Sequence, residues 1–129
     1  MRQIYKIIFT LVIAVFCLIS PAAIAIADTT IYEIEKQPAE YYPIAFEYFN
    51  KLPKGVSLVS GTISAHNITD NVDATATILQ STTATITGTQ ALVKIRAGTT
   101  GKRYQITLRV TCSNSYILED ELYLSVREL

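Results

Sequence analysis

Residues 98–112 read GTTGKRYQITLRVTC, a glycine-bounded turn followed by a strand in which apolar and polar residues alternate. Within this strand the even positions are apolar or aromatic and the odd positions are polar, the two-residue period of a strand with one buried face. The alternation returns from Tyr116 to Val126, with Tyr116 on the apolar face, after the turn-prone residues 113–115. Because an isolated hairpin is only marginally stable, the rest of the chain must supply an opposing sheet.

Four residues around this hairpin are predicted to be structural. Gly98 and Gly101 provide the turn, and Tyr104 follows it where sandwich domains often place a tyrosine whose hydroxyl bonds the backbone across a corner. Pro38 is the fourth, because a proline cannot donate to a strand ladder and therefore belongs at a corner or a sheet edge.

The N-terminal residues 1–27 are predicted to form a signal helix that is cleaved on export. Arg2 and Lys6 precede an uncharged apolar run, and Ala25-x-Ala27 presents the small residues that signal peptidase reads. A retained membrane anchor is the alternative, since the run is long enough to span a bilayer. With cleavage, the protein is expected in the periplasm, at the cell surface or in the medium, and it meets a membrane only through this segment.

Cleavage leaves residues 28–129, which is 102 residues and one domain's worth of chain. Two of the eleven basic residues are lost and all eleven acidic ones remain, so the net charge becomes −2 and nothing in it attracts nucleic acid. Only Cys112 is left of the two cysteines, which excludes an intrachain disulfide. Its place in the apolar row predicts a small buried hydrophobic residue.

Strand patterns recur throughout this domain, and the fold class follows from them. An interruption at Ser60-Gly61 indicates a bulge or a bend between sheets, and residues 67–73, the most turn-rich segment, are expected to form a long loop. Eight strands in all predict an all-β fold, an immunoglobulin-like β-sandwich of about seven to eight strands, with a barrel as the alternative. The six strands expected ahead of the C-terminal hairpin are residues 31–35, 44–48, 56–65, 74–79, 83–87 and 90–97.

The residues needed for catalysis are scarce. The chain has one histidine, His66, which borders the long loop and is expected at the surface, and it has no phosphate-binding glycine loop or metal-ligand spacing. The acidic residues 119–121 are interpreted as a charged flank that blocks edge-to-edge strand pairing. We therefore predict no catalytic residue, no metal site, no cofactor and no enzymatic activity.

An uncharged stretch, residues 74–92, is the candidate contact surface for a protein partner or for self-association, because an uncharged, β-prone edge can be extended by another chain. A periplasmic or cell-surface ligand- or carbohydrate-binding module is the alternative, and it needs an exposed aromatic platform, for which Tyr41, Tyr42 and Tyr123 are the candidates. The candidate interaction residues, including the adjoining loop, are Thr75, Thr77, Thr83, Thr85, Asn67 and Asp70.

Several short motifs, spread over about residues 34–128, resemble the fiber-tail adaptor proteins of tailed phages and prophages. They are Lys36-x-Pro38-x-Glu40, Ile44-x-Phe46, Gly98-x-x-Gly101-x-x-Tyr104-x-Ile106, Ser113-Asn114 and the closing Leu124-Ser125-Val126-Arg127-Glu128. The resemblance implies a small β-domain that serves as a joint between virion parts and has no catalytic residues. The export segment is an addition to that pattern, since virion proteins assemble in the cytoplasm, and it leaves open an exported relative of the family.

Overall fold

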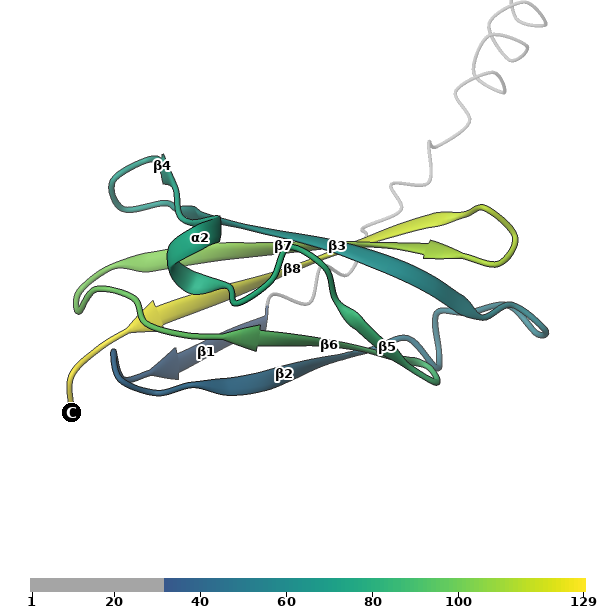
Figure 1. Ribbon diagram of the computed structural model, residues 1–129, viewed down its shortest axis with the longest axis horizontal. Helices are drawn as coiled ribbons and strands as arrows, with labels where there is room; N and C mark the ends of the chain where they lie inside the picture. The colour runs from purple at the N-terminus through teal and green to yellow at the C-terminus, as the bar shows by residue number, and fades with distance from the viewer. Residues whose placement is uncertain (1–31) are drawn as a thin grey trace, which may run out of the picture.

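Two β-sheets packed face to face are formed by residues 32–129, the part of the chain that the computed structural model describes (Figure 1). The larger sheet has the strand order β1-β8-β7-β3-β4 and the smaller one β2-β6-β5. Only β1 and β8 pair in parallel. The prediction of an all-β sandwich is therefore confirmed. The elements are β1 (Tyr32–Lys36), β2 (Tyr42–Glu47), β3 (Leu58–Asn67), β4 (Val72–Asp73), α2 (Thr75–Ile78), β5 (Thr85–Thr87), β6 (Gln90–Ile95), β7 (Arg103–Cys112) and β8 (Ile117–Val126).

The core lies between the sheets and follows the alternation of the long strands. The even residues of β7 and the C-terminal half of β8 point inward, where they meet the buried residues of β2 and β6. Burial of these β-branched and aliphatic side chains supplies most of the driving force for the fold. The buried set from the four strands is Tyr104, Ile106, Leu108, Val110, Cys112, Leu122, Leu124, Val126, Phe46, Ala91, Val93 and Ile95.

The expected bulge is present in β3. The register between β3 and β7 shifts between Leu58 and Ser60, directly before the Ser60-Gly61 pair that interrupts the strand pattern. The extra residue, Val59, is exposed. The strand nevertheless continues to Asn67, so the interruption bends β3 locally without ending it.

The strand predicted for residues 74–79 is wrong, because Thr75–Ile78 is a single helical turn, α2. Ala74 and Ile78 stand four residues apart and both are buried, and the backbone N–H of Ile78 donates to the carbonyl of Ala74 at 2.9 Å. Packing of these two side chains on the core outweighs the strand preference of the threonines between them. α2 is drawn between the levels of the two sheets in Figure 1.

Two further expectations are corrected at the turns. The segment expected as a long loop, residues 67–73, is a tight turn that returns into β4, whose two residues pair with the end of β3. Tyr116 does not join the apolar face, since β8 begins only at Ile117 and the Tyr116 side chain is 63% exposed. The turn before β8 therefore ends one residue later than the alternation suggests.

The predicted signal segment, residues 1–27, lies outside the described residues. Within residues 32–129 no helix has the length and apolar character needed to cross a membrane.

Candidate interaction surfaces

The turn between β6 and β7 is organised by Tyr104. Its ring is 2% exposed, and its hydroxyl accepts a hydrogen bond from the backbone N–H of Thr99 at 3.0 Å. Gly98 and Gly101 have φ values of 101° and 82°, in the left-handed region that favours glycine. The N–H of Gly101 donates to the carbonyl of Val126 at 2.8 Å, which ties the turn to the end of β8. Tyr104 and the two glycines are therefore framework residues, as predicted from the turn pattern, although Thr99, Thr100 and Gly101 are exposed at the surface.

Asn67 and Asp70, two of the candidate interaction residues, have different environments. Asn67 is 6% exposed, and its side-chain oxygen accepts hydrogen bonds from the N–H groups of Thr69 and Asp70, both at 3.0 Å. Asp70 is exposed and pairs with the Lys102 ammonium at 2.7 Å. The hydrogen bond from Lys102 holds the pKa of the Asp70 carboxyl below its usual value. Asn67 therefore shapes the turn, while Asp70 remains at the surface.

The threonine-rich segment closes one side of the sandwich. After α2, the chain bonds to β6, where the N–H of Gln80 donates to the carbonyl of Lys94 at 3.1 Å. It then crosses to β3, with the N–H of Ile63 donating to the carbonyl of Thr82 at 2.8 Å, and returns to pair with β6 as β5. The segment is therefore tied to both sheets, and β5, the last strand of the small sheet, pairs only with β6 among the described residues.

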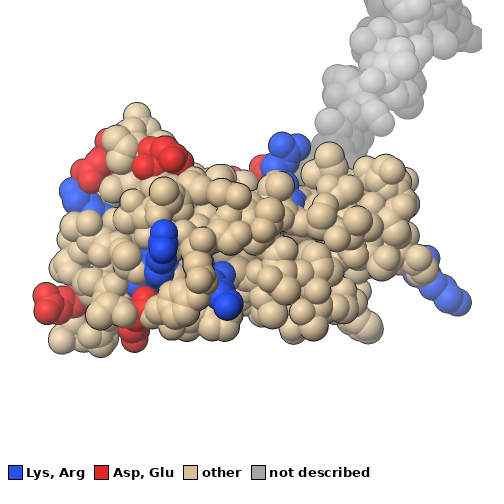
Figure 2. Space-filling model, viewed as in Figure 1, with Lys and Arg blue, Asp and Glu red and all other residues tan. Residues whose placement is uncertain are grey.

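Three of the four candidate threonines in this segment are exposed: Thr77, Thr83 and Thr85. The hydroxyl of Thr75 is instead turned to β3, where it accepts a hydrogen bond from the N–H of Ala65 at 3.1 Å. On the side of the molecule seen in Figure 2, the surface around β5 is free of charged side chains. An open depression of about 590 Å³ lies beside α2, with Arg96 at its rim.

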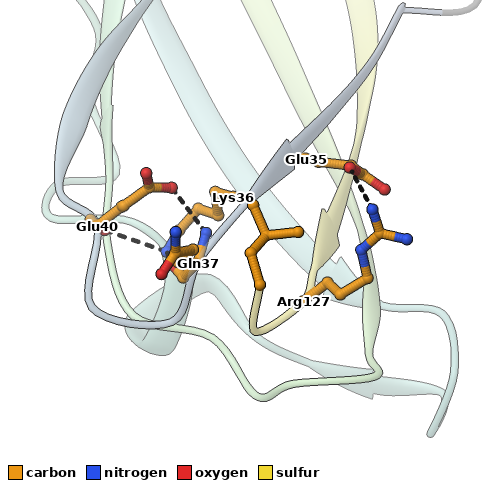
Figure 3. A pocket seen from close by; sticks show the side chains of 6 residues that line it. Glu35, Lys36, Gln37, Glu40 and Arg127 are labelled. Carbon is orange, nitrogen blue, oxygen red and sulfur yellow. Dashed lines mark hydrogen bonds and ion pairs between the residues drawn. The ribbon is translucent and has the colours of Figure 1, made fainter.

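The corner between β1 and β2 encloses a buried ammonium group (Figure 3). Lys36 is 3% exposed, and its Nζ donates to the carbonyl oxygens of Gln37 at 2.7 Å, Glu40 at 3.1 Å and Pro38 at 3.4 Å. Burial lowers the pKa of Lys36, and the nearby Glu40 carboxylate opposes that shift. The turn that contains Pro38 thus wraps a cation supplied by the chain itself. The pocket at this corner measures about 80 Å³, too small for most ligands.

A second buried polar group lies at the opposite end of β2. The Tyr48 hydroxyl has no hydrogen-bond partner among the described residues, and burial together with the neighbouring Asp120 raises the pKa of Tyr48 well above its usual value. Lys51 pairs with Asp120 at 2.6 Å and lies 5.3 Å from the centre of the Tyr48 ring. The phenol therefore stays neutral, and the ion pair next to it joins the β2–β3 loop to β8.

The aromatic residues considered for a ligand platform do not lie on one surface. Tyr42 is half-buried at the start of β2, an edge strand of the small sheet, and the exposed Tyr41 directly precedes it. Tyr123 is on the outer face of the large sheet, where the Arg103 guanidinium stacks over its ring at 4.5 Å. The described residues thus assemble no platform from these three tyrosines.

Four of the eight large apolar or aromatic side chains exposed among residues 32–129 belong to one end of the sandwich, whose turns lie on the right in Figure 1. The β2–β3 loop and the β7–β8 turn are joined there by a hydrogen bond from the N–H of Ser113 to the carbonyl of Ser57 at 2.8 Å. These turns and the adjoining strand ends carry Phe49, 70% exposed, with Val59, Tyr116 and Ile117. Sequence reasoning missed this group, whose only signal is that Phe49 directly follows the inward-facing Tyr48. Exposed apolar patches on small domains often mark protein contacts.

The described part of the chain offers little for metal or thiol chemistry. No group of three or more His, Cys, Asp or Glu side chains in residues 32–129 is arranged to hold a metal ion. The Cys112 thiol is buried in the core row of β7. His66 is half-exposed, and its Nε2 lies 3.0 Å from Oδ1 of Asn71.

Comparison with protein families gives a match over most of the chain. A family model described as podophage GP4 fiber-tail adaptor protein gp77 matches residues 36–125. Neither the curated proteins nor the solved structures yield a significant match to this chain.

Proposed function

Because the chain belongs to the podophage GP4 fiber-tail adaptor protein gp77 family, we propose that it is a non-catalytic structural adaptor that joins a fiber protein to the tail of a phage particle. The observation that carries the proposal is the extent of the match. Residues 36–125 run from the last residue of β1 to the next-to-last residue of β8, so the family pattern covers β2 to β7 and nearly all of β8, and not one motif.

Two separate surfaces support a joining role. The apolar group around Phe49 and Tyr116 lies at one end of the sandwich, and the threonine surface of α2 and β5, flanked by Arg96 and Asp73 beside α2, covers one side. An adaptor needs at least two contact regions that do not overlap. The coupling of a rigid β-framework with exposed loops is a common way to present such regions.

The proposed fold of the adaptor is immunoglobulin-like. The supporting observation is the strand order: β2-β6-β5 corresponds to the B-E-D sheet of such domains, and β8-β7-β3-β4 to their G-F-C sheet with one added strand. The Tyr104 hydroxyl bonded to the backbone a few residues upstream is a further similarity.

The proposal includes export of the mature domain. It is supported by the basic residues Arg2 and Lys6, the uncharged apolar run that follows, and Ala25-x-Ala27, all of which lie outside the described residues. An exported member of the family would carry its adaptor role to the periplasm, the cell surface or the medium.

The adaptor role is tested by co-purification. The tagged full chain is mixed with a fiber protein and a tail protein of the phage or prophage that encodes it, and the complexes are sized by light scattering. We expect a stable assembly that contains all three proteins. An adaptor role is refuted if the chain binds neither protein under conditions in which both are folded.

Self-association through the threonine surface is a further part of the proposal, and lysine substitutions test it. Thr77→Lys or Thr85→Lys places a charge on the uncharged surface and should abolish assembly, with a melting temperature within a few degrees of wild type. Ser64→Lys, on the exposed face of β3, is the matched control. Assembly that persists in both variants would contradict this surface, and a collapsed monomer would show that the threonines support the core.

A further inference from the structure

The feature that carries a new inference is a mismatch in strand length at the edge of the large sheet. β8 pairs with β7 along nearly its whole length, from Ile117 to Ser125. On its other side β8 pairs with β1 only from Leu122 onward. Within residues 32–129, no strand covers the preceding part of this side, residues 117–121 of β8, which we call the open edge.

The backbone groups of the open edge can be assigned from the ladder. The carbonyl of Tyr116 accepts a hydrogen bond from the N–H of Cys112, and the carbonyl of Val126 accepts one from the N–H of Gly101. The backbone N–H and C=O groups of the even residues of β8 therefore point toward β7. The N–H of Arg127 donates to the carbonyl of Lys36 at 3.0 Å, so the backbone N–H and C=O groups of the odd residues point toward β1. Alternation along β8 therefore points the N–H groups of Ile117, Glu119 and Glu121, and the C=O groups of Ile117 and Glu119, away from β7 at the uncovered edge. The Glu121 carbonyl lies where the parallel ladder pairs it with the N–H of Tyr32. An edge of this kind is a template for an added strand.

The side chains of the open edge define what the added strand must carry. Ile117, Glu119 and Glu121 project from the outer face and all are exposed. Arg109 on β7 pairs with Glu119 at 3.2 Å, whereas the residue opposite Glu121 on β7 is Thr107. Glu121 makes no ion pair with a residue in the described part of the chain. A cation beside Glu121 and an apolar residue beside Ile117 would complement this edge.

The same charges disfavour a second copy of the chain as the occupant. Antiparallel pairing of two open edges around their midpoint brings Glu119 of each copy together, and like charges directly opposite one another destabilise a sheet. The acidic residues therefore disfavour pairing with an identical edge and favour pairing with a strand that carries basic residues. This accounts for an acidic flank on a strand edge that is otherwise free to pair.

We propose that the open edge, Ile117–Glu121, binds an extended strand of a fiber or tail protein that carries a lysine or arginine beside Glu121 and an apolar residue beside Ile117. The inference rests on the proposed adaptor function and names the partner chemistry of one of its contacts. Main-chain hydrogen bonds supply the binding, and the alternate side chains supply the specificity.

A peptide experiment tests the edge directly. The isotope-labelled full chain is titrated with the peptide acetyl-Thr-Lys-Val-Thr-Val-Ile-Thr-amide, whose Lys, Thr and Ile fall on one face, and with a control peptide that has Glu in place of Lys. We expect amide-exchange protection and chemical-shift changes at Ile117, Glu119 and Glu121 with the first peptide only. Equal binding of both peptides would overturn the inference. Protection of these three amides before any peptide is added would also overturn it, because the chain's own residues ahead of Tyr32 would then occupy the edge.

Two variants carry the test to the assembled complex. Glu119→Pro removes an N–H that points off the sheet and leaves the β7 ladder intact, and Glu121→Lys reverses the unpaired charge; each should weaken capture of the partner at least about tenfold. Glu128→Lys, beyond β8, is the control. Circular dichroism checks that each variant is folded. If the wild type joins the fiber and tail proteins and both variants do so equally well, the edge inference fails while the adaptor role stands; if the wild type binds neither protein, the adaptor role itself fails.

Discussion

The two glycines of the β6–β7 turn provide a sharp test of how this corner is built. Both have positive φ, 101° at Gly98 and 82° at Gly101, so alanine is strained at either position. Only Gly98 is crowded: a Cβ added there would lie 2.7 Å from Cγ2 of Val126 and 3.2 Å from Cδ1 of Ile78, whereas a Cβ at Gly101 meets nothing within 4 Å. Gly98→Ala and Gly101→Ala therefore share the backbone penalty and differ in steric overlap.

The magnitudes follow from these two terms. A left-handed alanine costs about 1–2 kcal/mol, offset by about 0.4–1 kcal/mol of lost freedom in the unfolded chain, so Gly101→Ala should cost about 1 kcal/mol. Overlap inside a packed core adds about 1–3 kcal/mol, which brings Gly98→Ala to about 2–4 kcal/mol. The difference between the variants measures the overlap with the buried Val126 and Ile78 side chains together.

Urea denaturation of the full-length protein measures both free energies of unfolding, and the slope of each curve checks that unfolding remains two-state. A third variant, Val126→Ala, is combined with Gly98→Ala to complete a double-mutant cycle. The Gly98→Ala penalty should shrink when Val126 is already alanine, because the overlapping methyl group is gone. Equal destabilisation of Gly98→Ala and Gly101→Ala, with no coupling to position 126, would refute the steric account.

Three further predictions concern other parts of the chain. Tyr104→Phe removes the acceptor of the Thr99 N–H and should lower the free energy of unfolding by on the order of 1 kcal/mol. Tyr104→Ala should lower it by on the order of 3 kcal/mol or more, because it leaves a cavity. Thermal denaturation measures both variants, and wild-type melting temperatures in both would show that Tyr104 does not stabilise this turn. The pKa of Asp70 is lowered by Lys102, so their contact stabilises the fold above the unfolded-state pKa, about 3.9, and is lost as pH falls through the lower folded value. The urea midpoint of the wild type should therefore decrease as pH falls from about 5 to about 3, and Asp70→Asn should make this decrease smaller. An equal decrease in both proteins would contradict this role of the ion pair. Mass spectrometry of exported protein should find a mature chain that begins at Asp28, whereas recovery of only the full-length chain from membranes would favour an anchor.

The parts of the fold that sequence reasoning predicted are those set by local pattern. Alternation from Tyr104 to Cys112 places every even side chain inward because strand side chains have a period of two, regardless of the partner strand. The glycine turn and the bulge near Ser60 were also visible, since glycine and interrupted alternation mark such backbone locally. The family resemblance, built on the same motifs, is confirmed by the match to residues 36–125.

The features that sequence reasoning missed depend on contacts between distant segments. Ala74 and Ile78 form a helical turn because the core behind them has room for both, which the threonines around them do not reveal. No local pattern around Lys36 indicates that it is buried, because its burial depends on three carbonyl groups of a turn that folds back over it. The open edge of β8 arises from the register between β1 and β8, which no local pattern of Ile117–Glu121 encodes.

The parallel pairing of β1 with β8 has a mechanical consequence. The chain enters β1 at Tyr32 and leaves β8 at Val126, and the two strands run side by side over five paired positions that end at Lys36 opposite Val126. A pulling force applied across the domain through these two points draws β1 toward its start and β8 toward its end, in opposite directions along the same axis. All five paired positions then bear the load together in shear. The turn-linked strands β7 and β8 would instead separate one hydrogen bond at a time if they were pulled apart at the end opposite their turn. A joint that holds two bodies under tension is best loaded along this pair of strands.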